Sequence, residues 1–177
     1  MQDEENIVRR AKQHDQAALT QLYEENFNKI YRYIVLKIGE RTEAEDMTQQ
    51  VFVKALKSIS SYKWQGKPFS AWLFRIAHNQ IVDYLRKKSR RVIVPLEETL
   101  AGGGDDPSLE AERNIDIEQL AAATGKLTGA QQEVISLRFA GDLPIAQVAK
   151  IMGKSVGAVK ALQHSGIVSL RKIMATG

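Results

Sequence analysis

The chain has 177 residues, of which 44% are hydrophobic and 26% charged, with a net charge of +4 at pH 7 and no cysteine. These values are ordinary for a globular protein, and the lack of cysteine excludes disulfides, thiolate metal sites and cysteine nucleophiles. The first ten residues are acidic and lack a signal-peptide core, and no apolar run approaches the roughly 20 residues of a membrane span. We therefore expect a cytoplasmic protein without membrane insertion, built of one domain or two small ones.

The charge is distributed unevenly along the chain. Residues 1–96 carry a net charge of +6, residues 97–118 carry −7 and residues 119–177 carry +5. Two basic blocks on either side of an acidic connector suggest two contacts with a polyanion. The connector itself would lie on a basic partner, or on the chain's own basic faces when no DNA is bound.

The first 40 residues predict two helices. Acidic side chains at positions 3–5 fill the first turn of a helix over residues 3–16, where the helix dipole favours anions. His14 and Asp15 interrupt it. Residues 16–39 then keep an apolar period of 3.6, and Gly39 suits the C-terminal end of that second helix.

A third helix is predicted to begin at Thr42, because Thr42 and Glu45 match a capping box. Its expected apolar stripe is Met47, Val51, Phe52, Ala55, Leu56 and Ile59. The opposite side carries a carboxylate, two amides and an amine: Asp46, Gln49, Gln50 and Lys54. This face suits docking to a protein, although the stretch alone favours a merely hydrated helix face.

Residues 69–91 predict an amphipathic helix that ends in a run of cations. Its apolar face is Phe69, Trp72, Leu73, Ile76, Ala77, Ile81, Tyr84 and Leu85. Its polar face is Arg75, His78, Asn79, Asp83, Arg86 and Lys87. Guanidinium and amide groups can read base edges, and the cations can hold phosphates. A core helix with a solvated face is the alternative.

An aromatic and glycine loop precedes this helix. It contributes Trp64, Gln65, Gly66 and Lys67. The loop and the helix together suggest a unit that grips DNA with some bases unstacked. Trp64 is the candidate for the invading aromatic ring, whereas Trp72 and Phe74 are expected in the core.

Residues 95–114 predict a flexible acidic linker, because three glycines, a proline and several acids follow one another there. As a loose coil it would span about 25 Å, and pulled straight about 65 Å. The two halves, residues 1–94 and 115–177, would then sit on separate parts of one ligand.

Two short helices are expected after the linker. The first lies near residues 117–121. Thr128 and Gln131 form a second capping signature, which starts a helix over residues 129–139 with Phe139 in the core. Pro144 is expected at the first position of the next helix.

Residues 145–172 carry the most specific signal, a helix-turn-helix. Ala149 allows close approach of two helices, Gly153 can adopt the positive φ of the turn, and Val159 packs the second helix on the first. Ser155 is a good N-cap. Such a second helix lies in the major groove, although an ordinary helical hairpin remains the alternative. The candidate DNA contacts are Lys154, Ser155, Gly157, Ala158, Lys160, Ala161, Gln163, His164 and Arg171.

Four stretches of the chain, taken together, resemble the extracytoplasmic-function (ECF) group of the sigma-70 family of bacterial RNA polymerase sigma factors. They are residues 44–52, 69–79, 143–149 and 155–160, in the family's order. The resemblance covers nearly everything outside the linker. It implies an all-α fold of two small helical domains, a sigma region 2 bundle (residues 1–94) and a sigma region 4 helix-turn-helix (residues 115–177), joined by the flexible linker.

The resemblance also implies roles. Asp46, Gln49, Gln50 and Lys54 would dock on the clamp helices of core RNA polymerase. Residues 64–68 and the polar face of the following helix would melt and read the minus-ten promoter element, and the second domain would read the minus-thirty-five element. We expect a monomer without metal or cofactor, held inactive by an anti-sigma factor and associated with the nucleoid during initiation.

Two other functions compete with this interpretation. A stand-alone helix-turn-helix repressor or activator would use the second half alone. An enzyme would use carboxylates such as Glu43, Glu45 and Asp46, but these acids sit in a helix's first turn, where dipole compensation explains them. We therefore expect no enzymatic activity.

The recognition helix departs from the family's pattern. Family members often carry several arginines in the middle of this helix, whereas in this chain the first arginine of the helix is Arg171. Gly166 also costs about 1 kcal/mol of helix propensity relative to alanine. We expect weak phosphate anchoring by this helix.

Overall fold

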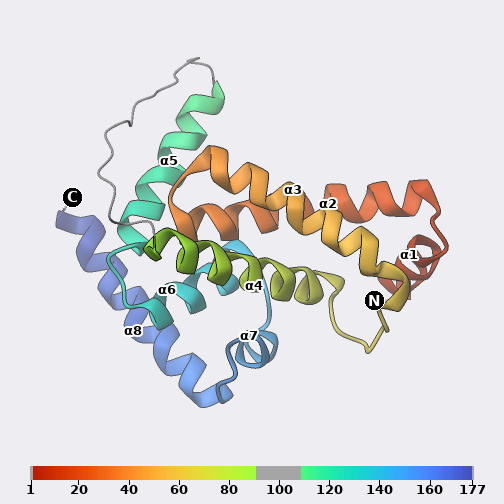
Figure 1. Ribbon diagram of the computed structural model, residues 1–177. Coiled ribbons are helices and arrows are strands. Elements are labelled where there is room, and N and C mark those ends of the chain that lie inside the picture. The colour runs from red at the N-terminus through yellow and green to blue at the C-terminus, as the bar shows by residue number, and fades with distance from the viewer. Residues whose placement is uncertain (1, 91–108, 177) are drawn as a thin grey trace.

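The computed structural model describes residues 2–90 and 109–176, and every regular element in these ranges is helical (Figure 1). The first half holds α1 (Gln2–Lys12), α2 (Gln16–Ile38), α3 (Arg41–Ser58), the 3-10 turn η1 (Ile59–Ser61) and α4 (Phe69–Arg90). The second half holds α5 (Leu109–Thr124), α6 (Gly129–Ile135), the π-helical turn η2 (Ser136–Ala140), α7 (Ile145–Met152) and α8 (Val156–Thr176). None of these helices is long and apolar enough to cross a membrane. The predicted all-α fold is confirmed.

Local capping sets most helix ends where they are predicted. Asp15 Oδ1 accepts the backbone N–H of Ala17 at 3.0 Å, so α2 begins just after it. Gly39 ends α2 with a φ of 81°. The capping box predicted at Thr42 is wrong, because α3 starts at Arg41 with Glu40 in the N-cap position and no side-chain cap. Gly39 directly precedes that cap, so α3 begins as soon as the chain has turned.

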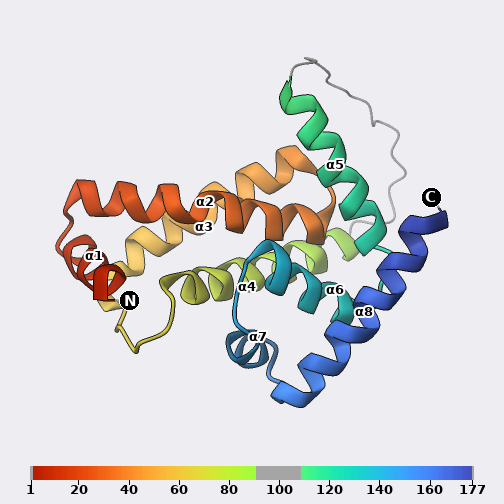
Figure 2. The ribbon, with the colours of Figure 1, turned by 180° about the vertical axis from the view of Figure 1, so that it is seen from behind.

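The two halves share one hydrophobic core. Tyr33 and Phe74 of the first half and Leu137 and Val159 of the second are each completely buried and belong to one cluster. In both views α5 crosses the end of α2, while α6 and α7 lie beside α4 (Figures 1 and 2). The two halves therefore form one packed body.

Part of the predicted linker is helical. α5 begins at Leu109, inside residues 95–114. The remaining linker residues, 95–108, lie outside the described ranges, as do residues 92–94. The second half thus begins with a long helix that packs along the first half.

Three apolar residues expected in the core are exposed. Leu56 (45% exposed) lies about 100° around α3 from the buried Ala55, off the stripe that faces the bundle. Leu85 (41%) lies one turn beyond Ile81, the last buried residue described in α4. Phe139 (56%) is turned outward by η2, where the N–H of Gly141 bonds to the carbonyl five residues back at 3.1 Å.

The second half contains the predicted helix-turn-helix. Gly153 has a φ of 67° and joins α7 to α8, and Ser155 Oγ accepts the N–H of Ala158 at 3.1 Å. The capping box of Thr128 and Gln131 is confirmed, whereas Pro144 is the N-cap of α7 and not its first residue.

Gly166 has a packing role that its position in the sequence did not suggest. It is buried where α8 crosses α6, and a Cβ there would lie 3.2 Å from Ile135 Cγ1. The glycine therefore permits close approach of the two helices, which offsets its poor helix propensity.

Candidate nucleic-acid interface

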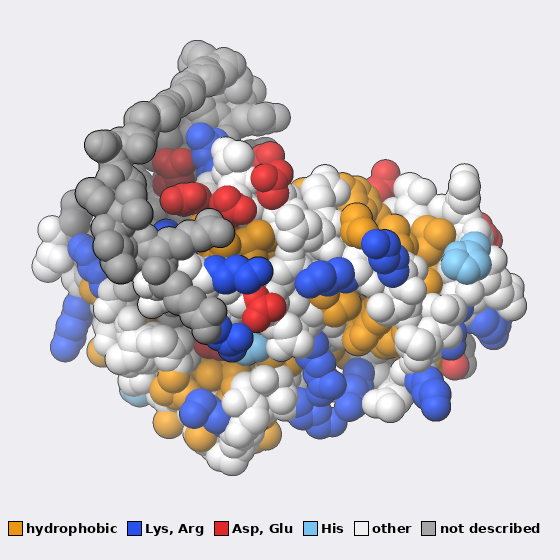
Figure 3. Space-filling model, in the orientation of Figure 1, with side chains coloured by type: hydrophobic (Ala, Val, Ile, Leu, Met, Phe, Trp, Pro, Cys, Tyr) orange, Lys and Arg blue, Asp and Glu red, His pale blue; other side chains and the backbone are white. Residues whose placement is uncertain are grey.

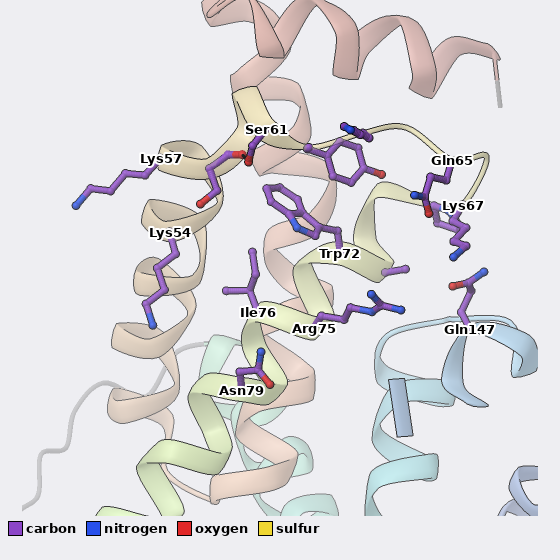
Figure 4. A pocket seen from close by; sticks show the side chains of 15 residues that line it. Lys54, Lys57, Ser61, Gln65, Lys67, Trp72, Arg75, Ile76, Asn79 and Gln147 are labelled. Carbon is purple, nitrogen blue, oxygen red and sulfur yellow. Dashed lines mark hydrogen bonds between the residues drawn. The ribbon is translucent and has the colours of Figure 1, made fainter. Parts of the chain in front are cut away.

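A basic cavity of about 680 Å³ opens between the end of α3, the loop over residues 62–68 and the start of α4 (Figure 4). Five of its lining side chains are cationic, and none of the residues lining it is acidic. The lining is Lys54, Lys57, Ser58, Ser61, Tyr62, Lys63, Gln65, Lys67, Pro68, Ala71, Trp72, Arg75, Ile76, Asn79 and Gln147. The cavity thus combines amines, amides and aromatic rings in one place.

One face of α4 forms the floor of the cavity. Trp72, Arg75 and Asn79 recur at intervals of three and four residues and line the cavity together (Figure 4). The start of α4 is anchored because the N–H of Phe69, itself buried, donates to Glu4 Oε1 at 3.1 Å. The floor is therefore held on a rigid helix.

Aromatic rings form part of the wall. The Tyr62 and Trp72 ring centroids are 4.7 Å apart at an interplanar angle of 42°. Both rings are only partly buried. An unstacked base could stack on such a surface, which contributes about 1–3 kcal/mol per base in proteins that bind single strands.

Lysine and arginine side chains gather between the start of α4 and α7 (Figure 3). Interaction with Lys150 of α7, a like charge, lowers the pKa of Lys67 below its ordinary value. A phosphate placed here would relieve the repulsion. The cavity is therefore suited to an anionic ligand that carries planar rings.

The structure brings together only part of the predicted minus-ten set. Gln65, Lys67, Arg75 and Asn79 line the cavity. Gly66 shapes the loop with a φ of 77°.

The two tryptophans differ from what the sequence suggested. Trp64 is partly buried, packs against the core and does not line the cavity, whereas Trp72 lines it. Trp72 sits at the margin of the apolar face of α4, so one side of its ring packs on Tyr62 and Phe69 and another reaches the cavity. Trp72 thus packs against the core, as predicted, and also lines the cavity.

The remaining predicted minus-ten residues lie outside the cavity. His78 does not line the cavity and instead contacts α6, where its Nδ1 is 3.1 Å from Glu133 Oε2. Asp83 lies 3.6 Å from Arg86 on the exposed surface of α4. Lys87 is exposed nearby. The polar face of α4 therefore divides between the cavity, a buried contact and open surface.

Several lining residues escaped the sequence analysis. They are Lys57, Ser61 and Gln147. Lys57 lies in the last turn of α3 and Ser61 ends η1, directly before the aromatic loop, so their proximity to that loop was a usable signal. Gln147 comes from α7, and no local pattern connects it to this site.

The predicted polymerase-docking residues lie on the exposed side of α3. Asp46, Gln49 and Gln50 are exposed. Gln49 Nε2 donates to Tyr23 Oη at 3.2 Å, and Gln50 Oε1 accepts from Gln80. Lys54, one turn further, lines the basic cavity instead.

The recognition helix α8 presents a polar stripe. Gly157, Lys160, Ala161 and His164 are exposed at helical spacing. Lys154, Ser155, Ala158 and Arg171 are exposed as well, whereas Gln163 is half-buried. No group of three or more acidic or histidine side chains able to hold a metal ion occurs in the described parts of the chain.

Comparison with known proteins matches both halves to family models. The description "Sigma-70 region 2" matches residues 22–91, and "Sigma-70, region 4" matches residues 124–172. The chain is 34% identical over 173 residues to the ECF RNA polymerase sigma factor BldN of Streptomyces coelicolor, covering 95% of this chain and 64% of that protein. It is 30% identical over 178 residues to the ECF RNA polymerase sigma factor SigW of Bacillus subtilis, with 93% of each covered.

Two solved structures share the fold. CnrH, in complex with the cytosolic domain of CnrY, superposes with a TM-score of 0.72 at 22% identity, over 96% of both chains. The sigma factor RpoE of Bartonella quintana, in complex with the anti-sigma factor NepR, superposes with a TM-score of 0.70 at 23% identity, over 88% of this chain and 96% of the other.

Proposed function

Because this chain belongs to the sigma-70 family and, within it, to the ECF group of RNA polymerase sigma factors, we propose that it binds core polymerase, directs it to particular promoters and helps to melt the minus-ten element. The observation that best supports the melting role is the basic cavity at the start of α4, where aromatic rings, amides and amines converge. Residues 1–94 and 115–177 serve the two promoter elements, joined by residues 95–114.

In the minus-ten role, a non-template base leaves the duplex and stacks in the cavity. Trp72 and Tyr62 supply ring surface, and Asn79 and Gln65 supply hydrogen-bond donors and acceptors. Lys57 and Lys63 are placed for the flanking phosphates. Arg86 and Lys87 extend this contact along α4 toward the adjoining duplex.

The defining experiment is transcription in vitro with purified core polymerase on a library of promoters from the native host. The proposal expects initiation at a defined set of start sites that core polymerase alone does not use. A protein that instead bound duplex DNA without polymerase, as a symmetric pair, would be the stand-alone regulator and would contradict the proposal.

The exposed side of α3 is the proposed polymerase contact. Asp46, Gln49 and Gln50 supply its polar groups. The double variant Asp46→Lys with Gln49→Lys is expected to abolish assembly with core polymerase and leave the fold intact. Glu24→Lys, an equally exposed change on α2, serves as the control. Assembly retained by the double variant in gel filtration would refute this surface.

The exposed stripe of α8 is the proposed minus-thirty-five contact. Lys160 is its central cation, and Lys160→Ala is expected to weaken binding to the upstream element and to reduce the salt dependence by about one phosphate contact. A salt titration of holoenzyme binding that gives unchanged affinity and slope would remove Lys160 from the interface.

An inhibitory protein is the other proposed partner, since the solved structures of the same fold are complexes with CnrY and NepR. An apolar groove of about 720 Å³ on α2, α5, η2 and α8 suits such a partner, because large exposed apolar patches mark interaction sites. Phe139 (56% exposed) and Met174 (51% exposed) line this groove. Phe139→Lys is expected to weaken binding of an anti-sigma factor purified from the host and to leave assembly with core polymerase unchanged.

A further inference from the structure

The second half inserts one carboxylate into the first half. Glu133, on α6, is 6% exposed. Its Oε1 lies 2.5 Å from Lys37 Nζ, and its Oε2 accepts the Tyr33 hydroxyl at 2.6 Å and lies 3.1 Å from His78 Nδ1. Tyr33 and Lys37 belong to α2 and His78 to α4. All the partners of this carboxylate therefore come from the other half of the chain.

Neighbouring contacts reinforce this junction. Gln132 Nε2 donates to the carbonyl of Leu36, near the end of α2, at 3.0 Å. Gly141 sits against Phe74 of α4 so closely that a Cβ there would lie 2.6 Å from Phe74 Cζ. Glu133 therefore lies among closely packed contacts between the two halves.

We propose that Glu133 is a latch that holds the second half closed on the first, and that this closed form opens before both promoter elements are bound. In the closed form the carboxylate and Lys37 neutralise each other out of contact with water, and in an open form both would be hydrated. A pair with two such states can hold a closed conformation without preventing its release.

The need for opening rests on the proposed function. Elements named by positions about 25 base pairs apart lie about 85 Å apart along straight duplex DNA. In the closed form α4 and α7 touch, and Gln147 of α7 lines the minus-ten cavity. One closed molecule cannot hold two sites that far apart, and α7 also narrows access to the cavity.

The closed form contains an opposing contact. Lys67 lines the cavity together with Gln147 of α7, and Lys150 lies one turn further along α7, so like charges oppose closure at this edge while the Glu133 contacts favour it. The balance predicts opposite effects for two substitutions. Glu133→Gln leaves Lys37 buried without a counter-charge in the closed form and favours opening, whereas Lys150→Glu replaces the repulsion by an attraction and favours closing.

Distance measurement between two spin labels tests the latch. The chain has no cysteine, so Glu24→Cys on α2 and Lys126→Cys before α6, both exposed, provide the only labelling sites. The labelled full chain should give one short, narrow distance distribution. Glu133→Gln should add a longer, broad component and raise the open-to-closed ratio at least about tenfold, and Lys150→Glu should remove any such component already present.

A matched control separates the latch from a general loss of charge. Arg41 and Glu118 also join the two halves, at 2.8 Å, but their side chains are 43% and 48% exposed. Glu118→Gln should leave the distribution unchanged. Equal opening in Glu118→Gln and Glu133→Gln, or no opening in Glu133→Gln, would overturn the proposal.

A milder variant guards against misfolding. If Glu133→Gln loses helical content in circular dichroism, Tyr33→Phe removes one hydrogen bond to the carboxylate, keeps the ring packed on Phe74, and should open the chain to a smaller extent. An unchanged distribution in a folded Tyr33→Phe would then count against the latch.

The last measurement uses the holoenzyme. The unsubstituted labelled chain should shift to the long distance when core polymerase and promoter DNA are added, and persistence of the short distance on a promoter would overturn the requirement for opening. The measurements on the free chain need neither polymerase nor DNA, so a failure of the latch and a failure of the proposed function give different results.

Discussion

The basic cavity and the Glu133 cluster both use side chains of α4, but they use charge in opposite ways. The cavity gathers five cations at the surface without an acidic residue in its lining. The Glu133 cluster buries one carboxylate among Lys37, His78 and Tyr33. Surface charges without a counter-charge can bind a charged ligand, whereas buried ion pairs can hold parts of the chain together.

The pKa values of the ionisable groups differ between the buried cluster and the cavity in the same way. Burial by itself raises the pKa of Glu133, but the hydrogen bond with His78 and the charge of Lys37 outweigh it and lower that pKa to about 2. Burial, followed by the nearby Glu133 charge, raises the pKa of Tyr33 well above its ordinary value. In the cavity, interaction with Lys150 lowers the pKa of Lys67. The charges of the buried cluster are paired with opposite charges, whereas those that line the cavity are all positive.

The largest effect is expected from Glu133→Ala. Removal of one partner leaves Lys37 buried without a counter-charge, which costs about 3–5 kcal/mol in other proteins. The free energy of unfolding, measured in urea by circular dichroism on the full chain, should fall by about that amount unless opening of the halves relieves part of it. A loss below about 1 kcal/mol would place this carboxylate among ordinary surface charges.

A pH titration should give an effect of about 3 kcal/mol. The pKa of Glu133 is about 2 in the folded protein against an ordinary value of 4.5, and each unit corresponds to about 1.4 kcal/mol. The stabilisation is therefore complete above pH 4.5 and is lost as the pH falls from 4.5 to about 2. In Glu133→Gln this part of the pH dependence should vanish, and an identical profile in both proteins would contradict the assignment.

On the cavity side, Trp72→Ala should reduce promoter melting by about 1–3 kcal/mol, the stacking contribution of one base. Permanganate reactivity of unpaired thymines in the holoenzyme complex measures it. Trp64→Ala is the matched control, because Trp64 packs against the core and does not line the cavity. A larger melting defect in a folded Trp64→Ala than in Trp72→Ala would reverse this assignment.

A small effect, about 0–1 kcal/mol in the free energy of unfolding, is expected from Glu118→Ala. Glu118 pairs with Arg41 across the same two halves, but both side chains remain in contact with water. Urea unfolding beside Glu133→Ala tests whether burial, and not charge alone, decides the contribution. Equal losses in the two variants would remove that distinction.

The smallest effect on stability is expected from Lys57→Ala, which should leave the free energy of unfolding unchanged. Lys57 is exposed at the cavity, so its removal should instead reduce the salt dependence of single-strand binding by about 0.7 in the log–log slope. A salt titration of the holoenzyme on a premelted promoter measures this. An unchanged slope would show that Lys57 contacts no phosphate.

Much of the fold could be predicted from neighbours in the sequence. Asp15, the Thr128–Gln131 capping box and Ser155 bond to backbone groups two or three residues away. Gly39 and Gly153 adopt positive φ values that favour glycine. These contacts are made within one turn of chain, so residue types at fixed spacing predict them.

The candidate site could be predicted only in part. Gln65, Lys67, Arg75 and Asn79 follow from the polar side of a helix and the loop before it. The sequence could not show that Trp72, and not Trp64, lines the cavity, because both stand near the start of α4 and local spacing does not show which ring packs beside Tyr62. Gln147 joins the lining from α7, about 70 residues further along the chain.

The sequence by itself determined the helices, the helix-turn-helix and the family, since periodicity, capping and motif order are properties of short stretches. Only the tertiary structure decided that the halves share a core and that Glu133 meets Tyr33 and His78, which are 100 and 55 residues away along the chain. An acid within a short helix reads as a solvated side chain, because local spacing contains no information about what the helix packs against. Burial and pairing arise only when distant segments meet, and they turned that acid into the charged centre of the junction.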